Sequence, residues 1–220
     1  MPKALKNNGL TIALMALFLL SILGQFFAGW SYQNEELAEH GAKTLSLGAY
    51  ALDPEFLSSV FENWESEFLQ MSAYVVLTAM LIQKGSSESR APDDPPRDEN
   101  LKAQARKDGA PHILHGGVAV RWVYAHSLGL VLFILFLLSF MLHWVNSAKA
   151  AAETALRHGE KAPSVLSYLG DAQLWFESFQ NWQSEFLSTA VLVVLSIWLR
   201  QKESPESKPV AAPHAETGSG

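Results

Sequence analysis

The 220-residue chain is 49% apolar and 17% charged, contains no cysteine, and carries a formal net charge of -6. The absence of cysteine excludes disulfide frameworks, thiolate catalysis and cysteine-ligated zinc or iron–sulfur sites. The acidic balance argues against a nucleic-acid-binding protein, which would present a basic face. Mean hydropathy is only +0.08, but the charges are confined to a few segments with long uncharged stretches between them, a pattern typical of membrane proteins.

The first uncharged stretch runs from Leu10 to Trp30. At about 1.5 Å per residue it extends about 30 Å, the thickness of a bilayer hydrocarbon core. A cleaved secretory signal is the alternative, because Lys3 and Lys6 precede the stretch and residues 26–28 resemble the start of a cleavage site. The stretch is long for a signal, and a similar stretch recurs later in the chain, so a membrane-spanning helix is favoured.

Three further spans follow from the apolar runs. Residues 123–145 form a second long run with a tryptophan near each end, where tryptophan rings settle at membrane interfaces. The runs Phe68–Ile82 and Phe186–Leu199 are shorter, but each follows a polar stretch that is compatible with a helix. The sequence therefore predicts four spans, at about residues 10–30, 63–82, 123–145 and 181–199.

Lysine and arginine predict the orientation of these spans. Twelve of the 16 basic residues lie before the first span, between the second and third predicted segments, or after the last span. Because cytoplasmic loops of membrane proteins are enriched in lysine and arginine, both termini and the central linker are expected in the cytoplasm. The predicted location is the bacterial cytoplasmic (inner) membrane, crossed several times.

The chain matches itself at an offset of 118 residues. Residues 10–89 (the first copy) align without gaps with residues 128–207 (the second copy), and more than a third of the 80 positions are identical. Each copy contains two spans and so inserts in the same orientation, which predicts parallel repeats and disfavours inverted-repeat transporter folds. The fold class predicted is all-α, a four-helix membrane protein built from two parallel helical hairpins with helical extensions outside the membrane.

The repeat also indicates where helices end and begin. Gly41 and Gly159 each follow a histidine after a helix-compatible stretch, a pattern typical of a helix C-terminus. Asp53 and Asp171 are expected to cap the helices that follow, and the first of these is predicted to run from Pro54 to Gln83. The predicted organisation is a first hairpin at 1–84, a flexible cytoplasmic linker at 85–121, a second hairpin at 122–202 and a disordered cytoplasmic tail at 203–220.

One polar block could carry function. The pattern Asn-Trp-x-Ser-Glu-Phe-Leu occurs at 63–69 and again at 181–187. Its ionisable group lies within a predicted span, where such residues are costly and usually functional. The candidate ion, proton or packing site therefore consists of Asn63, Ser66 and Glu67 in the first copy and Asn181, Ser184 and Glu185 in the second.

Two interpretations of this block remain open. In the favoured one it is a packing signature, with Trp64 and Trp182 as interfacial anchors and nothing transported. In the other, Glu67 and Glu185 approach each other in a low dielectric and share a proton or bind a cation. A tilt of the helix or a thinner membrane would move Glu67 into the interface, so its estimated depth does not decide between the two.

No enzyme signature is present. The sequence lacks a Gly-x-Ser-x-Gly elbow, a His-Glu-x-x-His pattern and glycine-rich nucleotide loops. We expect no enzymatic activity, no catalytic residue, no bound metal and no cofactor.

With its doubled Asn-Trp-x-Ser-Glu-Phe-Leu block, paired His-Gly and paired Gln-Lys-x-Ser, the chain resembles an uncharacterised family of bacterial integral membrane proteins described only as a domain of unknown function. The resemblance implies a four-span protein of the cytoplasmic membrane and brings no activity or site residue. We expect a non-enzymatic structural or partner-binding component; the alternative is a small proton, cation or solute transporter or channel that uses the paired glutamates. The expected partners are the lipid bilayer, a second copy of the chain or another membrane protein, and not nucleic acid.

Overall fold

The computed structural model describes residues 3–95 and 97–218. Residues 1, 2, 219 and 220, at the ends of the predicted first hairpin and tail, and residue 96 in the predicted linker lie outside the described residues. The chain is 66% helical, and no strand occurs among the described residues. The all-α prediction is confirmed.

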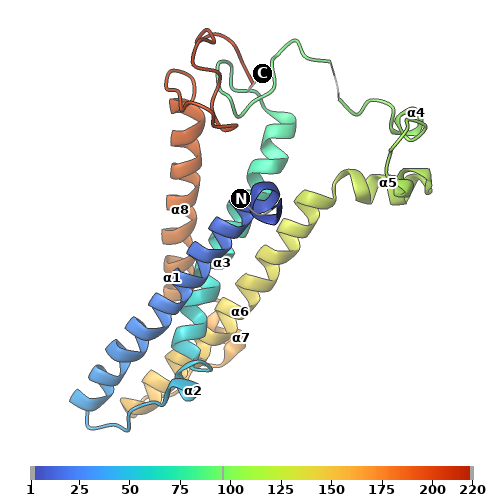
Figure 1. Cartoon of the computed structure of the whole chain (residues 1–220). Coiled ribbons are helices and arrows are strands. Elements are labelled where there is room, and N and C mark those ends of the chain that lie inside the picture. Colours follow the sequence, from blue (N-terminus) through green and yellow to red (C-terminus); the bar gives the residue numbers. More distant parts are fainter. Residues whose placement is uncertain (1–2, 96, 219–220) are drawn as a thin grey trace. The chain divides into compact units, whose positions relative to one another are not determined.

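The helices follow one another as shown in Figure 1. Their bounds are α1 Lys3–Glu39, α2 Leu47–Tyr50, α3 Pro54–Met80, α4 Leu101–Gln104, a 3-10 helix η1 His112–His115, α5 Val118–Ala125, α6 Ser127–Arg157, α7 Val165–Tyr168 and α8 Ala172–Leu195. The sequence offset of 118 residues separates the ends of α1 and α6, both bounds of α2 and α7, and the starts of α3 and α8. The two copies thus form the same order of helices.

Two of these helices, α1 and α6, are long and apolar enough to cross a membrane. On α1, six leucines are each more than half exposed: Leu10, Leu14, Leu17, Leu19, Leu20 and Leu23. A soluble protein rarely exposes so much contiguous apolar surface. These observations give weak support to a membrane location.

The predicted helix C-termini are confirmed at Gly41 and Gly159. Both glycines have positive φ angles, +68° and +71°, which glycine adopts without steric cost. The Ala42 N–H donates to the Leu37 carbonyl at 2.8 Å, and the Glu160 N–H donates to the Ala155 carbonyl at 2.8 Å. Each glycine therefore reverses the chain so that carbonyl groups of the last helical turn are satisfied.

The predicted helix starts are also confirmed. Asp53 Oδ1 accepts the Glu55 N–H at 3.0 Å, and Asp171 Oδ1 accepts the Gln173 N–H at 2.9 Å. These carboxylates satisfy N–H groups that the first helical turn leaves without intrahelical partners. Helix α3 begins at Pro54 as predicted and ends at Met80, slightly before the expected end.

The predicted third span is interrupted near its start. Helix α5 ends at Ala125 and α6 begins at Ser127, so the range 123–145 is not one helix. A ring nitrogen of His126 lies 2.8 Å from the Trp122 carbonyl, and Ser127 Oγ donates to the Tyr124 carbonyl at 2.8 Å. His126 has a φ of -111° and a ψ of 7°, which depart from helical values and separate the two helices.

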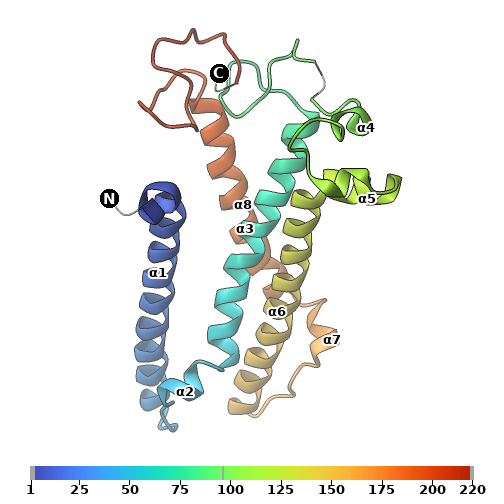
Figure 2. The same ribbon diagram turned by 45° about the vertical axis from the view of Figure 1, so that its right-hand side comes forward.

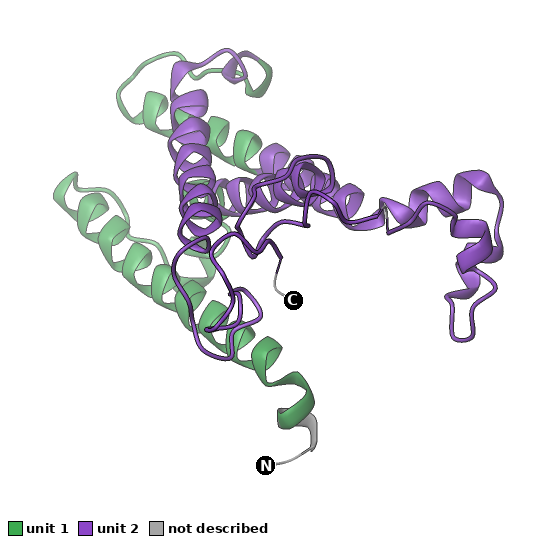
Figure 3. Cartoon of the chain, turned by 90° about the horizontal axis from the view of Figure 1, so that it is seen from above, with its two compact units in different colours: residues 1–60, 143–166 green, residues 61–142, 167–220 purple. Residues whose placement is uncertain are grey.

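The chain divides into two compact units, which are coloured separately in Figure 3. Unit 1 consists of residues 1–60 and 143–166, and unit 2 of residues 61–142 and 167–220. The division cuts across the two copies, because α3 and α6 each contribute to both units.

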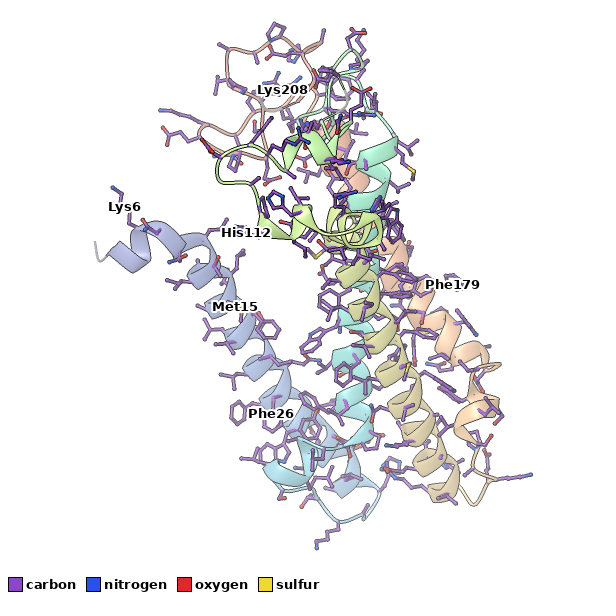
Figure 4. The ribbon with its side chains drawn as sticks, turned by 90° about the vertical axis from the view of Figure 1, so that its right-hand side faces the viewer. Lys6, Met15, Phe26, His112, Phe179 and Lys208 are labelled. Carbon is purple, nitrogen blue, oxygen red and sulfur yellow. The ribbon has the colours of Figure 1, made fainter. Side chains whose placement is uncertain are left out.

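Unit 1 has an aromatic core around the short helix α2. Tyr50 is buried, with ring centroids 5.3 Å from Phe26 and 5.0 Å from Phe56. Figure 4 shows Phe26 on the part of α1 that lies next to α2. The Tyr50 hydroxyl lies so close to Gly29 that a β-carbon there would be 2.2 Å from it, so α1 needs glycine at this position.

The turn between α1 and α2 is tied to α1 by polar contacts. Asn34 forms a two-way pair with the Leu45 backbone: its Nδ2 donates to the Leu45 carbonyl at 3.0 Å, and its Oδ1 accepts the Leu45 N–H at 2.6 Å. Trp30 Nε1 also donates to the Leu45 carbonyl, at 2.7 Å. The turn after Gly41 is therefore folded back onto the helix that precedes it.

In unit 2 the tail contacts the segment after α3. Lys208 is 1% exposed, and its Nζ donates to the carbonyls of Gly85 at 2.5 Å, Glu216 at 2.9 Å and His214 at 3.0 Å. Figure 4 shows Lys208 among the loops of the tail. These contacts join the first residues of the predicted linker to the tail. The flexibility of the linker and the disorder of the tail stay predictions.

Candidate functional site

The Asn-Trp-x-Ser-Glu-Phe-Leu block lies on α3 and α8, and the residues of both blocks belong to unit 2. Figures 1 and 2 show these two helices next to each other. Hydrogen bonds join them at several levels, and one of these is donated by Gln70 Nε2 to Thr189 Oγ1 at 2.5 Å. The block can therefore be judged by what its side chains contact within this unit.

The deepest polar contact of the block joins Trp182 to Glu65. Glu65 is fully buried, and its Oε1 accepts a hydrogen bond from Trp182 Nε1 at 2.7 Å. The Trp182 ring packs edge-to-face against Phe136 at 6.1 Å and Phe179 at 5.3 Å. Burial of a carboxylate without hydrogen bonds would cost several kcal/mol, so this donor stabilises the junction of α3 and α8.

A second contact of the same kind lies next to the first. Asn181 Nδ2 donates to Glu62 Oε1 and also to the Glu177 carbonyl, at 3.2 Å for the latter. Glu62 and Glu65 lie on one face of α3, three residues apart. Adjacent residues of the second block thus donate to two acids of the first.

The predicted serines make equivalent local contacts. Ser66 Oγ donates to the Asn63 carbonyl at 2.8 Å, and Ser184 Oγ donates to the Asn181 carbonyl at 2.9 Å. Ser66 is buried, whereas Ser184 is exposed. Both hydroxyls are engaged with the backbone of their own helix.

The predicted glutamates differ in exposure. Glu67 is exposed and Glu185 is half-buried, and the two lie close enough for their negative charges to interact. Asn63 is exposed, and the Trp64 ring contacts Phe61 edge-to-face at 5.5 Å. Their roles as an ion site or as interfacial anchors stay predictions.

Sequence reasoning did not single out Glu62 and Glu65 as site residues. It favoured residues that are identical in the two copies, whereas Glu62 and Glu65 are replaced by Gln180 and Gln183. The replacement of each glutamate by glutamine in the second copy is the signal that could have found them. An acid in one copy and an amide in the other indicates that the two equivalent positions contact different groups.

Unit 1 contains a separate polar cluster at the start of α3. Gln33 is 5% exposed, and its Nε2 donates to Asp53 Oδ1 and to Glu55 Oε2, both at 3.2 Å. Burial, followed by the negative charges of Asp53 and Glu36, raises the pKa of Glu55 above its ordinary value. This cluster links α1 to the N-terminus of α3 and favours a proton on Glu55.

One family model matches almost the whole chain. The match covers residues 1–219, and the family is described as a domain of unknown function (DUF6766). The chain belongs to this family. No curated protein and no solved structure matches the chain. Membership confirms the expected family of unknown function, while bacterial origin and the role of the block stay predictions.

Proposed function

We propose that the chain is a four-span protein of the bacterial cytoplasmic membrane, built from two parallel hairpins with both termini in the cytoplasm. Its proposed role is non-enzymatic, as a structural or partner-binding component. The apolar helices α1 and α6, the recurrence of helix bounds at an offset of 118 residues and the distribution of lysine and arginine support this architecture. The proposed partners are a second copy of the chain or another membrane protein.

The observation that carries the structural role is the hydrogen bond from Trp182 to the buried Glu65. An ion path needs polar groups that face water or the ion, whereas here the most deeply buried acid of the block accepts a hydrogen bond from the neighbouring helix. Asn181 and Glu62 repeat the arrangement. The block is therefore best explained as the element that fastens α3 to α8.

Single-cysteine labelling tests the topology, because the native chain has no cysteine to interfere. Lys43 lies in the turn between α1 and α2, which is proposed to face outward, and Lys202 lies at the proposed cytoplasmic end of the second hairpin. In intact cells we expect an impermeant maleimide to label Lys43→Cys, and to label Lys202→Cys only after permeabilisation. Equal labelling of both variants in intact cells would refute the proposed orientation.

Transport is the second candidate, favoured by the interaction between the charges of Glu67 and Glu185. The test is proton and cation flux in proteoliposomes, comparing the native chain with a Glu67→Gln, Glu185→Gln double variant. The structural role predicts no flux above protein-free vesicles for either protein, and equal thermal stability. Flux that the double variant abolishes would replace the structural role with transport.

A further inference from the structure

A cavity of about 350 Å³ lies within unit 2, between α3, the segment after α3, and α8. This volume is within the range of about 300–1,000 Å³ that is usual for small-molecule sites. From Gln70 to Thr78 the α3 side of the cavity extends about 12 Å along the helix. Its lining residues are Gln70, Tyr74, Leu77, Thr78, Leu81, Ile82, Gln83, Glu88, Ser89, Phe186, Thr189, Ala190 and Val193.

The walls of this cavity are mostly apolar. Leu77 and Leu81 contribute from the α3 side, and Ala190 and Val193 from α8. Two aromatic rings, those of Tyr74 and Phe186, also line it. A ligand that fills this space must be largely apolar, because the walls offer few hydrogen-bonding groups.

One carboxylate stands in this lining, and it is held in place. Glu88 Oε2 accepts a hydrogen bond from the Tyr74 hydroxyl at 2.9 Å, and Glu88 Oε1 accepts one from Ser87 Oγ at 3.3 Å. The Glu88 N–H donates to Ser86 Oγ at 3.1 Å, and this hydroxyl shares a hydrogen bond of 2.8 Å with Oγ of Ser196, the residue that follows α8. Both serines are buried, so the carboxylate is anchored to both walls of the cavity.

The charge of the lining is one-sided. Among the described residues that line the cavity, Glu88 is the acid and none is lysine or arginine. A fixed carboxylate beside apolar walls attracts a cation, and aromatic rings add favourable interactions with the cation's positive charge. The second copy has leucine in place of Tyr74, at Leu192, and its equivalent acid Glu206 does not line this cavity.

From this geometry we propose that the cavity binds a hydrophobic organic cation, with its charge beside Glu88 and its apolar groups against α3 and α8. The site is separate from Glu67 and Glu185, and the proposal does not depend on transport through them. It assigns Tyr74 and Glu88 of the first copy a binding role that their counterparts Leu192 and Glu206 do not share.

The test uses the full chain in lipid nanodiscs and tetraphenylphosphonium as the probe. Tetraphenylborate is a control of nearly the same size and opposite charge, and empty nanodiscs give the binding to lipid. We expect saturable binding of tetraphenylphosphonium at one site per chain and no saturable binding of tetraphenylborate. Equal saturable binding of both ions, or none of either, would overturn the proposal.

Three variants locate the site. Glu88→Gln keeps a hydrogen-bond acceptor for Tyr74 but removes the charge, and we expect its Kd for tetraphenylphosphonium to rise at least tenfold. Glu203→Gln removes an exposed acidic charge of the tail that does not line the cavity, and it should leave the Kd unchanged. Ala190→Leu fills the cavity without touching Glu88 and should weaken binding to a similar extent as Glu88→Gln.

Thermal unfolding of each variant separates loss of the site from loss of the fold. If Glu88→Gln lowers the Tm strongly, its binding result is not used. The binding of Ala190→Leu and the comparison with tetraphenylborate then test whether the cation binds in the cavity. Native affinity in a folded Glu88→Gln or a folded Ala190→Leu would show that the cation binds elsewhere, and would contradict the proposal.

Discussion

The two copies of the block differ where they contact each other. Across nine residues, 61–69 and 179–187, the copies are identical except at two positions, where Glu62 and Glu65 correspond to Gln180 and Gln183. In unit 2 the acids of the first block accept hydrogen bonds from Asn181 and Trp182 of the second. The residues that are identical in the two copies belong to the helical pattern that α3 and α8 have in common. The two substituted positions make the first copy the hydrogen-bond acceptor and the second copy the donor at the junction of α3 and α8.

The same difference continues toward the helix start. Glu55 of the first copy corresponds to Gln173 of the second, and both follow a capping aspartate by two residues. At all three positions the first copy is acidic and the second carries an amide. The first copy thus carries ionisable groups where the second carries amides, and the following experiments test contacts that distinguish the two copies.

The largest effect is expected from Trp182→Phe. This change keeps an aromatic ring beside Phe136 and Phe179 but removes the donor to the buried Glu65 carboxylate. We expect the free energy of unfolding in mixed micelles to fall by about 2–3 kcal/mol, because hydrogen bonds to buried charged groups are worth about that much.

The matched control for this change is Trp175→Phe, which removes a donor to the backbone carbonyl of Leu169 at an exposed site. It should cost about 1 kcal/mol or less. If the two tryptophan variants are equally stable, Trp182 is not the donor that stabilises the junction.

Gly29→Ala tests a difference between the copies in unit 1. The second copy has Ser147 at the position equivalent to Gly29. The new methyl group would lie 2.2 Å from the Tyr50 hydroxyl, and overpacking of this kind typically costs about 1–3 kcal/mol. Gly24→Ala in the same helix meets nothing within 4 Å and should raise the stability by about 0.5–1 kcal/mol. Thermal unfolding followed by circular dichroism measures both, and opposite signs are the expected result.

A smaller effect is expected from Glu65→Gln, which makes the first copy resemble the second at this position. The amide oxygen still accepts the Trp182 hydrogen bond, and the buried charge is gone, so we expect a change in stability of no more than about 1 kcal/mol. In a double-mutant cycle with Trp182→Phe, the coupling energy should be about 1 kcal/mol. A coupling energy of zero would show that the charge of Glu65 adds nothing to the hydrogen bond from Trp182.

The smallest effect concerns pH. Because burial first, and then Asp53 and Glu36, raise the pKa of Glu55, the folded protein holds a proton that the unfolded chain has released. This contribution to stability is fully present below the ordinary pKa of a glutamate, about 4.3, and is lost as the pH rises through the raised pKa.

Asp53→Asn should bring the titration of Glu55 to lower pH and narrow this pH window, while asparagine still caps α3. The ¹³C chemical shift of the Glu55 carboxyl, followed by NMR, measures the titration. Asp171→Asn is the control, because it changes the equivalent capping residue of the second copy, where glutamine at 173 replaces Glu55. It should leave the titration of Glu55 unchanged. An unchanged titration in Asp53→Asn would mean that the charge of Asp53 does not contribute to the raised pKa of Glu55.

Local signals in the sequence located the helix ends well. Gly41, Gly159, Asp53 and Asp171 act through their own backbone or the nearest turn, so their effect does not depend on distant residues. The break at His126 was missed because the apolar pattern continues through it, whereas the break lies in the backbone angles of that one residue.

The candidate site was harder to predict for a different reason. Glu67 and Glu185 were favoured because they recur, but recurrence reports what two helices have in common. The partners of Glu62 and Glu65 come from a helix more than 100 residues away, and a helical pattern in one segment contains no information on that pairing. The cavity beside Glu88 has the same origin, since its walls come from α3 and α8.

The contacts of Lys208 have a practical consequence for anyone who produces this protein. Its ammonium group donates hydrogen bonds to carbonyls of the tail and to that of Gly85. The Gly218 N–H also donates to the Ser86 carbonyl at 2.9 Å. A purification tag fused to the C-terminus, or a truncation that removes the last dozen residues, would disturb the loop that presents Glu88. An amino-terminal tag leaves these contacts between the tail and the segment after α3 intact, and it is the better choice for binding measurements.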